Sequence, residues 1–225
     1  MRKILIVSLL VIAADVCFGV PIRSMLAAER NYTEEQSEVL FDAEVEYLES
    51  TGTQYIDTGF TFSDGYSFSF KFRPINSPFI AYGANSNGHE CFIRSDGVYY
   101  WGGQRGSFGE SISDVDSEIN GSFDSGTAVL ERNGVSAIFS GRTPNDKEVY
   151  LFAILNITIP PIDKIKQRIY YHSITSIANG LVQDLIPVRF TNSHGMSEGA
   201  MYDRVTGQLF RNLGTGSFII GPDKE

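Results

Sequence analysis

Asn-Gly and Asp-Gly dipeptides punctuate the chain from residue 64 onward, and no other sequence feature constrains the fold as strongly. The two-residue turns of β-hairpins need positive φ angles, which Asn, Asp and Gly tolerate better than other residues. Several of these dipeptides lie between segments rich in β-branched and aromatic residues. The segments are therefore predicted to pair as antiparallel hairpins, in AVLERNGVSAIF, CFIRSDGVYYW and YYHSITSIANGLVQDLIPV.

The stretch SFSFKFR shows the two-residue period of a half-buried strand. It places Phe68, Phe70 and Phe72 on one face and polar residues on the other. No stretch after residue 43 has the pattern of a long amphipathic helix. Many short antiparallel strands in one domain predict an all-β fold, a sandwich of two antiparallel sheets.

The first residues, MRKILIVSLLVIAADVCFGVP, have the pattern of a secretory signal peptide: two basic residues, an apolar run and small residues near Gly19. Asp15 interrupts the apolar run, which is shorter than the roughly 20 residues of a membrane span. We therefore expect a secreted or cell-envelope protein with no membrane span after cleavage. The expected organisation is a signal peptide (1–19), a polar acidic linker (20–43), a folded domain (44–222) and a short polar tail (223–225).

The chain is acidic. Its formal net charge is −9, and loss of two basic residues and one acidic residue with the signal peptide changes this to −10. Nucleic acids and anionic membranes select basic surfaces, so neither is an expected partner. Cys17 would leave with the signal peptide and Cys91 would then be alone, which excludes an internal disulfide and a cysteine-based zinc site.

The two ends of the β-rich region resemble a known family. EYLESTGTQYIDTG (Glu46–Gly59) and MYDRVTGQLFRNLGTGSFIIGP (Met201–Pro222) are similar to the signature ends of exported bacterial and phage-associated proteins with a concanavalin A-like, laminin-G-like jelly roll. The resemblance covers nearly the whole mature domain and implies a concanavalin A-like jelly-roll sandwich of two antiparallel sheets. The wider superfamily includes lectins, adhesion modules and glucanases, so it implies a fold rather than one activity.

Two motifs imitate catalytic sites. EVEYLE resembles the carboxylate strand of the superfamily's glucanases, but Glu44 and Glu49 would point to opposite faces of a regular strand, whereas retaining glycosidases hold two carboxyls about 5–5.5 Å apart. GMSEG fits a nucleophile elbow, but no histidine follows Ser197. No catalytic motif is complete, and the chain is not predicted to be an enzyme. Instead, EYLESTGTQYIDTGF is predicted to be a structural strand that pairs near the closing segment.

No cofactor is predicted. The three histidines, His89, His172 and His194, are far apart and lack metal-binding spacing. A structural calcium ion is left open, because SNGHE and SDVDSE carry oxygen ligands, although neither has the spacing of a defined calcium loop.

The hairpin CFIRSDGVYYWGG supplies the candidate ligand surface. A two-residue Asp96-Gly97 loop would pair Arg94 with Tyr99 and place both on one face with Phe92 and Trp101. Arg94 is hard to bury, so this face is predicted to meet solvent. The opposite face would then be core, with Cys91, Ile93 and Tyr100.

Aromatic rings beside polar groups can stack on a sugar ring and bond to its hydroxyls. The candidate ligand-binding residues are Arg94, Tyr99, Trp101, Gln104 and Arg105. An alternative left open is that Phe92 and Trp101 pack inward and only the tip of Arg94 reaches solvent.

The leading functional prediction is an exported, non-catalytic domain that binds carbohydrate or another cell-surface polymer. A glycoside hydrolase of the same superfamily and a structural or adhesive protein that binds another protein are the alternatives. Release of reducing sugar would identify the hydrolase, and a glycan array would separate a lectin from a protein-binding adhesin. The oligomeric state is not predicted.

Overall fold

Antiparallel strands form the regular structure of the described chain, and no helix occurs among the described residues. The computed structural model describes residues 40–61, 63–76, 80–84, 91–101, 104–140, 148–155 and 162–225. Residues 1–39, with the predicted signal peptide and most of the predicted linker, lie outside this part. Leu40–Glu225 forms a compact unit, so residues 40–43 of the predicted linker belong to it. Within the described residues, no helix is long and apolar enough to cross a membrane.

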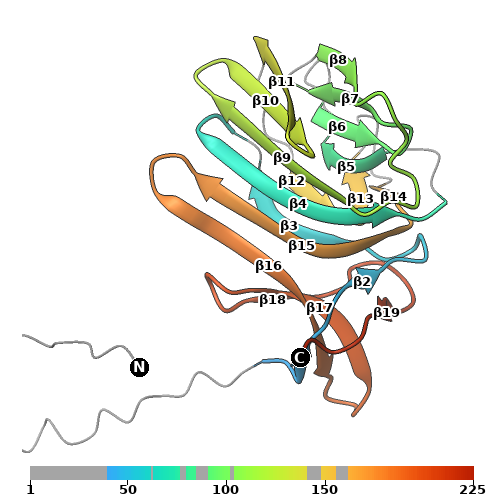
Figure 1. The fold of residues 1–225 in the computed structure, drawn as a ribbon. Helices are drawn as coiled ribbons and strands as arrows, with labels where there is room; N and C mark the ends of the chain where they lie inside the picture. Colours follow the sequence, from blue (N-terminus) through green and yellow to red (C-terminus); the bar gives the residue numbers. More distant parts are fainter. Residues whose placement is uncertain are drawn as a thin grey trace, which may run out of the picture. The chain divides into compact units, whose positions relative to one another are not determined.

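The large sheet has eleven strands, eight of them in the order β11-β10-β9-β4-β15-β16-β17-β18. These are β4 (Tyr66–Pro74), β9 (Ser117–Asp124), β10 (Thr127–Arg132), β11 (Val135–Ser140), β15 (Gln167–Ser176), β16 (Gly180–Thr191), β17 (Ser197–Asp203) and β18 (Leu209–Phe210). The other three strands are β1 (Ala43–Glu44), which pairs with β16, β2 (Leu48–Glu49), which pairs with β15, and β19 (Ile219–Ile220), which pairs with β2. Figure 1 shows the long strands of this sheet side by side.

The second layer consists of three smaller sheets. They are β3 (Ile56–Thr61) with β12 (Glu148–Leu151), β13 (Ala153–Leu155) with β14 (Ile162–Lys164), and β5 (Ile80–Ala84), β6 (Cys91–Arg94), β7 (Val98–Trp101) and β8 (Gln104–Ser107) in order. Residues from these strands share one buried hydrophobic cluster with residues of the large sheet. The predicted all-β sandwich is therefore confirmed.

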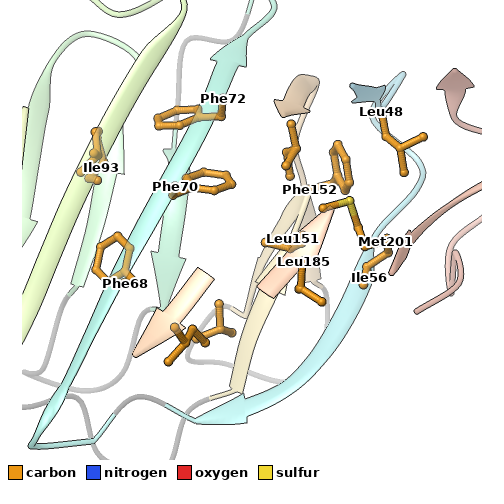
Figure 2. Packing of buried hydrophobic residues seen from close by; sticks show 14 of the residues in the cluster. Leu48, Ile56, Phe68, Phe70, Phe72, Ile93, Leu151, Phe152, Leu185 and Met201 are labelled. Carbon is orange, nitrogen blue, oxygen red and sulfur yellow. The ribbon is translucent and has the colours of Figure 1, made fainter. Parts of the chain in front are cut away.

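β4 supplies the centre of the core. Phe68, Phe70 and Phe72 are 4%, 0% and 0% exposed, whereas the polar residues between them are half-buried, as the alternating pattern predicts. The rings of Phe70 and Phe72 stack with their centroids 4.6 Å apart. Figure 2 shows the three phenylalanines along one strand, with Leu151, Phe152 and other core residues beside them.

The predicted pairing of the opening and closing segments is confirmed. β2 pairs with β19, with Leu48 opposite Ile220. The buried carboxamide of Gln54 donates hydrogen bonds to the carbonyl oxygens of Thr215 (3.1 Å) and Ser217 (3.0 Å). These contacts join EYLESTGTQYIDTGF to the closing segment of the domain, as predicted.

The predicted hairpins also form. Arg132 lies opposite Val135, and the turn residues Asn133 and Gly134 have φ angles of 51° and 79°. Two positive φ angles are what a two-residue type I′ turn requires. The hairpin of β15 and β16 closes with Ser176 opposite Gly180.

Candidate ligand-binding face of the large sheet

The register predicted for the hairpin of β6 and β7 is wrong. Ile93 lies opposite Tyr99, not opposite Tyr100, and Phe92 lies opposite Tyr100, not Trp101. The loop has three residues between the strands, and its last residue, Gly97, has a φ of 81°. A three-residue loop with a left-handed glycine shifts the pairing by one residue.

The slip moves Tyr99 to the opposite face from that predicted, because side chains alternate along a strand. Tyr99 is 6% exposed and its ring centroid lies 4.8 Å from that of Phe108. Burial raises the pKa of its hydroxyl. Tyr100, predicted to be core, is half-buried. Tyr99 therefore cannot be part of a solvent-facing surface on this hairpin.

The other predicted ligand residues remain on the hairpin or beside it. Arg94 is half-buried, and its Nη2 donates to the Oδ2 of Asp96 at 2.7 Å. Gln104 and Arg105 are exposed on β8, and Gln104 lies opposite Trp101. The side chain of Trp101 lies outside the described part of the structure. A ligand-binding role for these residues remains a prediction. The predicted face that Arg94 and Tyr99 were expected to share does not form, because Tyr99 points to the core.

A different surface combines polar and aromatic groups. We define the outer face as the face of the large sheet opposite the phenylalanine core. Short polar side chains from four adjacent strands line a shallow hollow of about 290 Å³ on it. The lining residues are Ser67, Phe68, Ser69, Asn120, Gly121, Ser122, Val129, Glu131, Ser173 and Thr175.

The strand register explains why these residues come together. Ser69 lies opposite Asn120 on one side and opposite Ser173 on the other, and Asn120 lies opposite Glu131. Residues opposite one another in neighbouring strands share a face. The row therefore presents hydroxyl, carboxamide and carboxylate groups across four strands, which together can both donate and accept hydrogen bonds.

A bulge in β15 adds two tyrosines to the outer face. Ile169 lies opposite Phe72 and Tyr171 opposite Lys71, so Tyr170 is an extra residue in the pairing. A bulge lets two consecutive side chains point to the same face. Tyr170 and Tyr171 are accordingly both half-buried, whereas Ile169 and His172, on either side of them, are fully buried.

Tyr47 completes a cluster with these residues, which we call the tyrosine cluster (Tyr47, Tyr170 and Tyr171). The ring centroids of Tyr47 and Tyr170 are 6.0 Å apart in an edge-to-face arrangement. The Arg168 guanidinium lies 4.0 Å from the centroid of the Tyr47 ring and bonds to Glu49 Oε2 through two nitrogens, at 2.8 and 2.6 Å. This ion pair fixes one side of the cluster.

Hydrogen bonds hold the other two hydroxyls. Tyr170 donates to Asp116 Oδ1 at 2.6 Å, and the Tyr171 hydroxyl lies 3.1 Å from that of Ser69. Burial and the bond to Asp116 raise the pKa of Tyr170, and burial raises that of Tyr171. Both phenols therefore stay neutral near pH 7. Because Ser69 also lines the hollow, the tyrosine cluster and the hollow are adjacent.

The residues that would act in the two motifs with catalytic spacing lie on strands in the described part of the chain. Glu44 lies on β1 and Glu49 on β2, where Glu49 is engaged by Arg168. Ser197 begins strand β17 and no helix follows it, so the nucleophile elbow is absent there. Over the described ranges, no three His, Cys, Asp or Glu side chains form a metal-sized group. The candidate calcium segment SNGHE lies outside the described residues, and calcium binding remains a prediction.

The sequence expectations missed the outer face because a bulge has no fixed residue signature. One signal was present. Ile169 and Ile174 are five residues apart, an odd spacing that prevents a regular strand from burying both. Both are buried, because the extra residue in the bulge between them turns both side chains to the same face of the sheet.

Comparisons with known proteins add a fold relationship. No known family model matches the chain, and no curated protein matches it. A solved structure from Bacteroides ovatus ATCC 8483, named "putative carbohydrate binding protein", is similar, with a TM-score of 0.50 and 11% sequence identity. The match covers 81% of this chain and 61% of that one, so the chain spans less than two thirds of that protein. At this identity the likeness concerns the fold alone.

Proposed function

We propose that the protein is an exported, non-catalytic binding domain that holds a glycan on the outer face of the large sheet. The observation that carries the proposal is the bulge in β15, which sets Tyr170 and Tyr171 beside a hollow lined by hydroxyl and amide groups. The signal-peptide pattern of the first 19 residues supports the proposal of export, and a fold shared with a protein named for carbohydrate binding is consistent with the role.

Sugars suit this surface chemically. A sugar ring has an apolar C–H face that packs on aromatic rings, and hydroxyls around its rim that exchange hydrogen bonds. The tyrosine cluster supplies half-buried rings, and the hollow supplies donors and acceptors on short side chains that leave room for a ligand. The hydrogen bond from Tyr170 to Asp116 and the cation–π contact of Tyr47 with Arg168, which is itself paired with Glu49, hold Tyr47 and Tyr170 in place, so little of their side-chain freedom would be lost on binding.

The charge on this face is mixed rather than uniformly acidic or basic. Lys71 Nζ lies 5.6 Å from the centroid of the Tyr170 ring, and Arg73 lies 3.9 Å from Asp116, while Glu131 lines the hollow. Such a mixture favours a neutral ligand over a polyanion, which would require a basic surface. A neutral polysaccharide is therefore the proposed ligand class.

A glycan array with the purified protein, followed by titration calorimetry on the best ligand, tests the proposal. Tyr171→Ala should lower the affinity about tenfold or more, a loss of about 1.4 kcal/mol or more. Tyr171→Phe, which keeps the ring, should lose less. Tyr150→Ala is the matched control, because Tyr150 is a half-buried tyrosine on β12 in the second layer.

Two results would count against the proposal. If the array finds no glycan, or if Tyr171→Ala binds as tightly as the parent while Tyr150→Ala does not, the outer face is not the binding site. Release of reducing sugar from a bound polysaccharide would overturn the non-catalytic part. In that case Glu131, the carboxylate in the hollow, is the first residue to test.

A further inference from the structure

β11 ends the large sheet with an unusual edge. Its six residues, Val-Ser-Ala-Ile-Phe-Ser, carry no charge and no proline. On one side it pairs with β10 along its whole length, and no described strand pairs with its other side. The backbone N–H and C=O groups along that side can therefore accept another strand.

Proteins usually protect such edges with charges, prolines, bulges or very short strands. Other outer strands of this protein follow that rule. β18 has only two residues, β8 carries Arg105, and β3 contains Asp57 and a left-handed Gly59 (φ 65°). β11 has none of these protections.

Two of the four exposed side chains of β11 are large and apolar, and the other two are serines. Val135 is 69% exposed and Ile138 is 70% exposed. Ala137 and Phe139 are half-buried and pack against the main core cluster. Because side chains alternate, Val135 shares the inner face with Ala137 and Phe139 but has little cover there. The inner face of the large sheet is thus incomplete at this edge.

We propose that β11 pairs antiparallel with β11 of a second copy of this chain, so that the two large sheets join across a two-fold axis. In an antiparallel pair, directly opposite residues point to the same face of the sheet. The two inner faces therefore lie on one side only if inner-face residues of one copy lie opposite inner-face residues of the other copy. This arrangement requires the two-fold axis to pass through a residue of β11. An axis at Ala137 sets Ala137 opposite its own copy and Val135 opposite Phe139 of the second copy. This register covers Val135 with an aromatic ring, a favourable cross-strand pair.

A second copy suits this edge better than an unrelated strand does. The chain has a net charge of −9, so two copies repel one another over most of their surfaces, and an uncharged strand gives the contact with the least repulsion. The strand is also complementary to itself in the Ala137 register. An axis at Ile138 would instead set Val135 opposite residue 141 and leave it without Phe139.

The dimer has a consequence that rests on the proposed function. A two-fold axis perpendicular to the joined sheets points both outer faces in the same direction. Two glycan sites on one side could engage one polymer together, which raises the apparent affinity without any new contact.

Light scattering across a range of protein concentrations tests the dimer, and it needs no ligand. The parent should show twice the mass of one chain at the higher concentrations. Val135→Lys and Ile138→Lys each place a charge at the contact and should raise the dissociation constant at least tenfold. Leu181→Lys is the matched control, because Leu181 is also an exposed apolar residue, 50% exposed, on another strand. A parent that is monomeric at every concentration, or lysine variants at β11 that dimerise like the parent, would overturn the proposal.

A cysteine experiment tests the register. Directly opposed residues in antiparallel strands have Cα atoms about 4.5–5.5 Å apart, which suits a disulfide. Ala137→Cys should therefore form a cross-linked dimer on mild oxidation, whereas Ile138→Cys should not. The parent, which carries Cys17 and Cys91, gives the background. Cross-linking of Ile138→Cys but not Ala137→Cys would overturn this register. These results do not depend on glycan binding, so failure of the dimer and failure of the proposed function are distinguishable.

Discussion

His172 should make the stability of this protein depend on pH. It is 0% exposed in β15, and its ring centroid lies 5.7 Å from that of Phe70 in an edge-to-face contact. Burial lowers its pKa from 6.5 to about 3. The unfolded chain therefore takes up a proton at this site near pH 6.5, whereas the folded chain does not.

The sign follows from that difference. Between pH 6.5 and about 3 the unfolded state binds more protons, so the free energy of unfolding falls as the pH falls. The stability due to this site is fully present above pH 6.5. Below pH 6.5 the slope is about 1.4 kcal/mol per pH unit, and above pH 6.5 it is close to zero. Going from pH 7.5 to pH 4.5 therefore includes two pH units of this slope and should cost about 2.7 kcal/mol at this site alone.

Urea unfolding at pH 7.5, 6.5, 5.5 and 4.5 measures the effect, with the parent compared with His172→Gln and His172→Phe. Carboxylates also contribute below about pH 5, but they do so in all three proteins. The variants should lose stability at pH 7.5 and then lose about 2.7 kcal/mol less than the parent between pH 7.5 and 4.5. His194→Gln is the control, because His194 is exposed. Equal pH slopes in the parent and both His172 variants would refute the reasoning.

Three further predictions concern stability and are each measured by chemical unfolding. Gly97→Ala should cost about 3 kcal/mol or more, because the φ of Gly97 is 81° and a Cβ there would lie 1.9 Å from a backbone oxygen. Gly134→Ala, where φ is 79° and the space around the residue is open, should cost about 1 kcal/mol. Equal costs for the two variants would contradict the steric account. Gln54→Ala should cost about 2–3 kcal/mol because it removes two hydrogen bonds to the closing segment. A change below 0.5 kcal/mol, about the level of a surface substitution, would count against a role of Gln54 in holding the closing segment. Arg168→Met and Glu49→Gln should show a coupling free energy of about 1.5–3 kcal/mol in a double-mutant cycle, since both side chains are less than one-third exposed; additive effects would mean that the pair contributes nothing.

Much of the fold could be predicted because local chemistry determines it. Asn133 and Gly134 accept the positive φ angles of a two-residue turn, and the turn fixes the register of β10 and β11. The alternating phenylalanines of β4 all point to the same face of the sheet, so the sequence identifies that face as the core side before any tertiary contact is known.

The candidate site could not be predicted in the same way, because it depends on one-residue shifts. Ser-Asp-Gly before Val98 is compatible with a two-residue or a three-residue loop, and the choice decides whether Tyr99 faces solvent or core. Likewise, only the bulge in β15 lets Tyr170 and Tyr171 share the outer face. In both places, packing of the core decides between registers that the local sequence allows equally.

Mapping of backbone amide chemical shifts during titration with the glycan selected on the array tests the central claim most directly. If the outer face binds the glycan, the largest saturable changes will fall on β4, β9 and β15, at residues 67–71, 118–122 and 170–175, and the hairpin of β6 and β7 will change little. Largest changes in residues 91–107, where the sequence alone placed the ligand surface, would contradict the account.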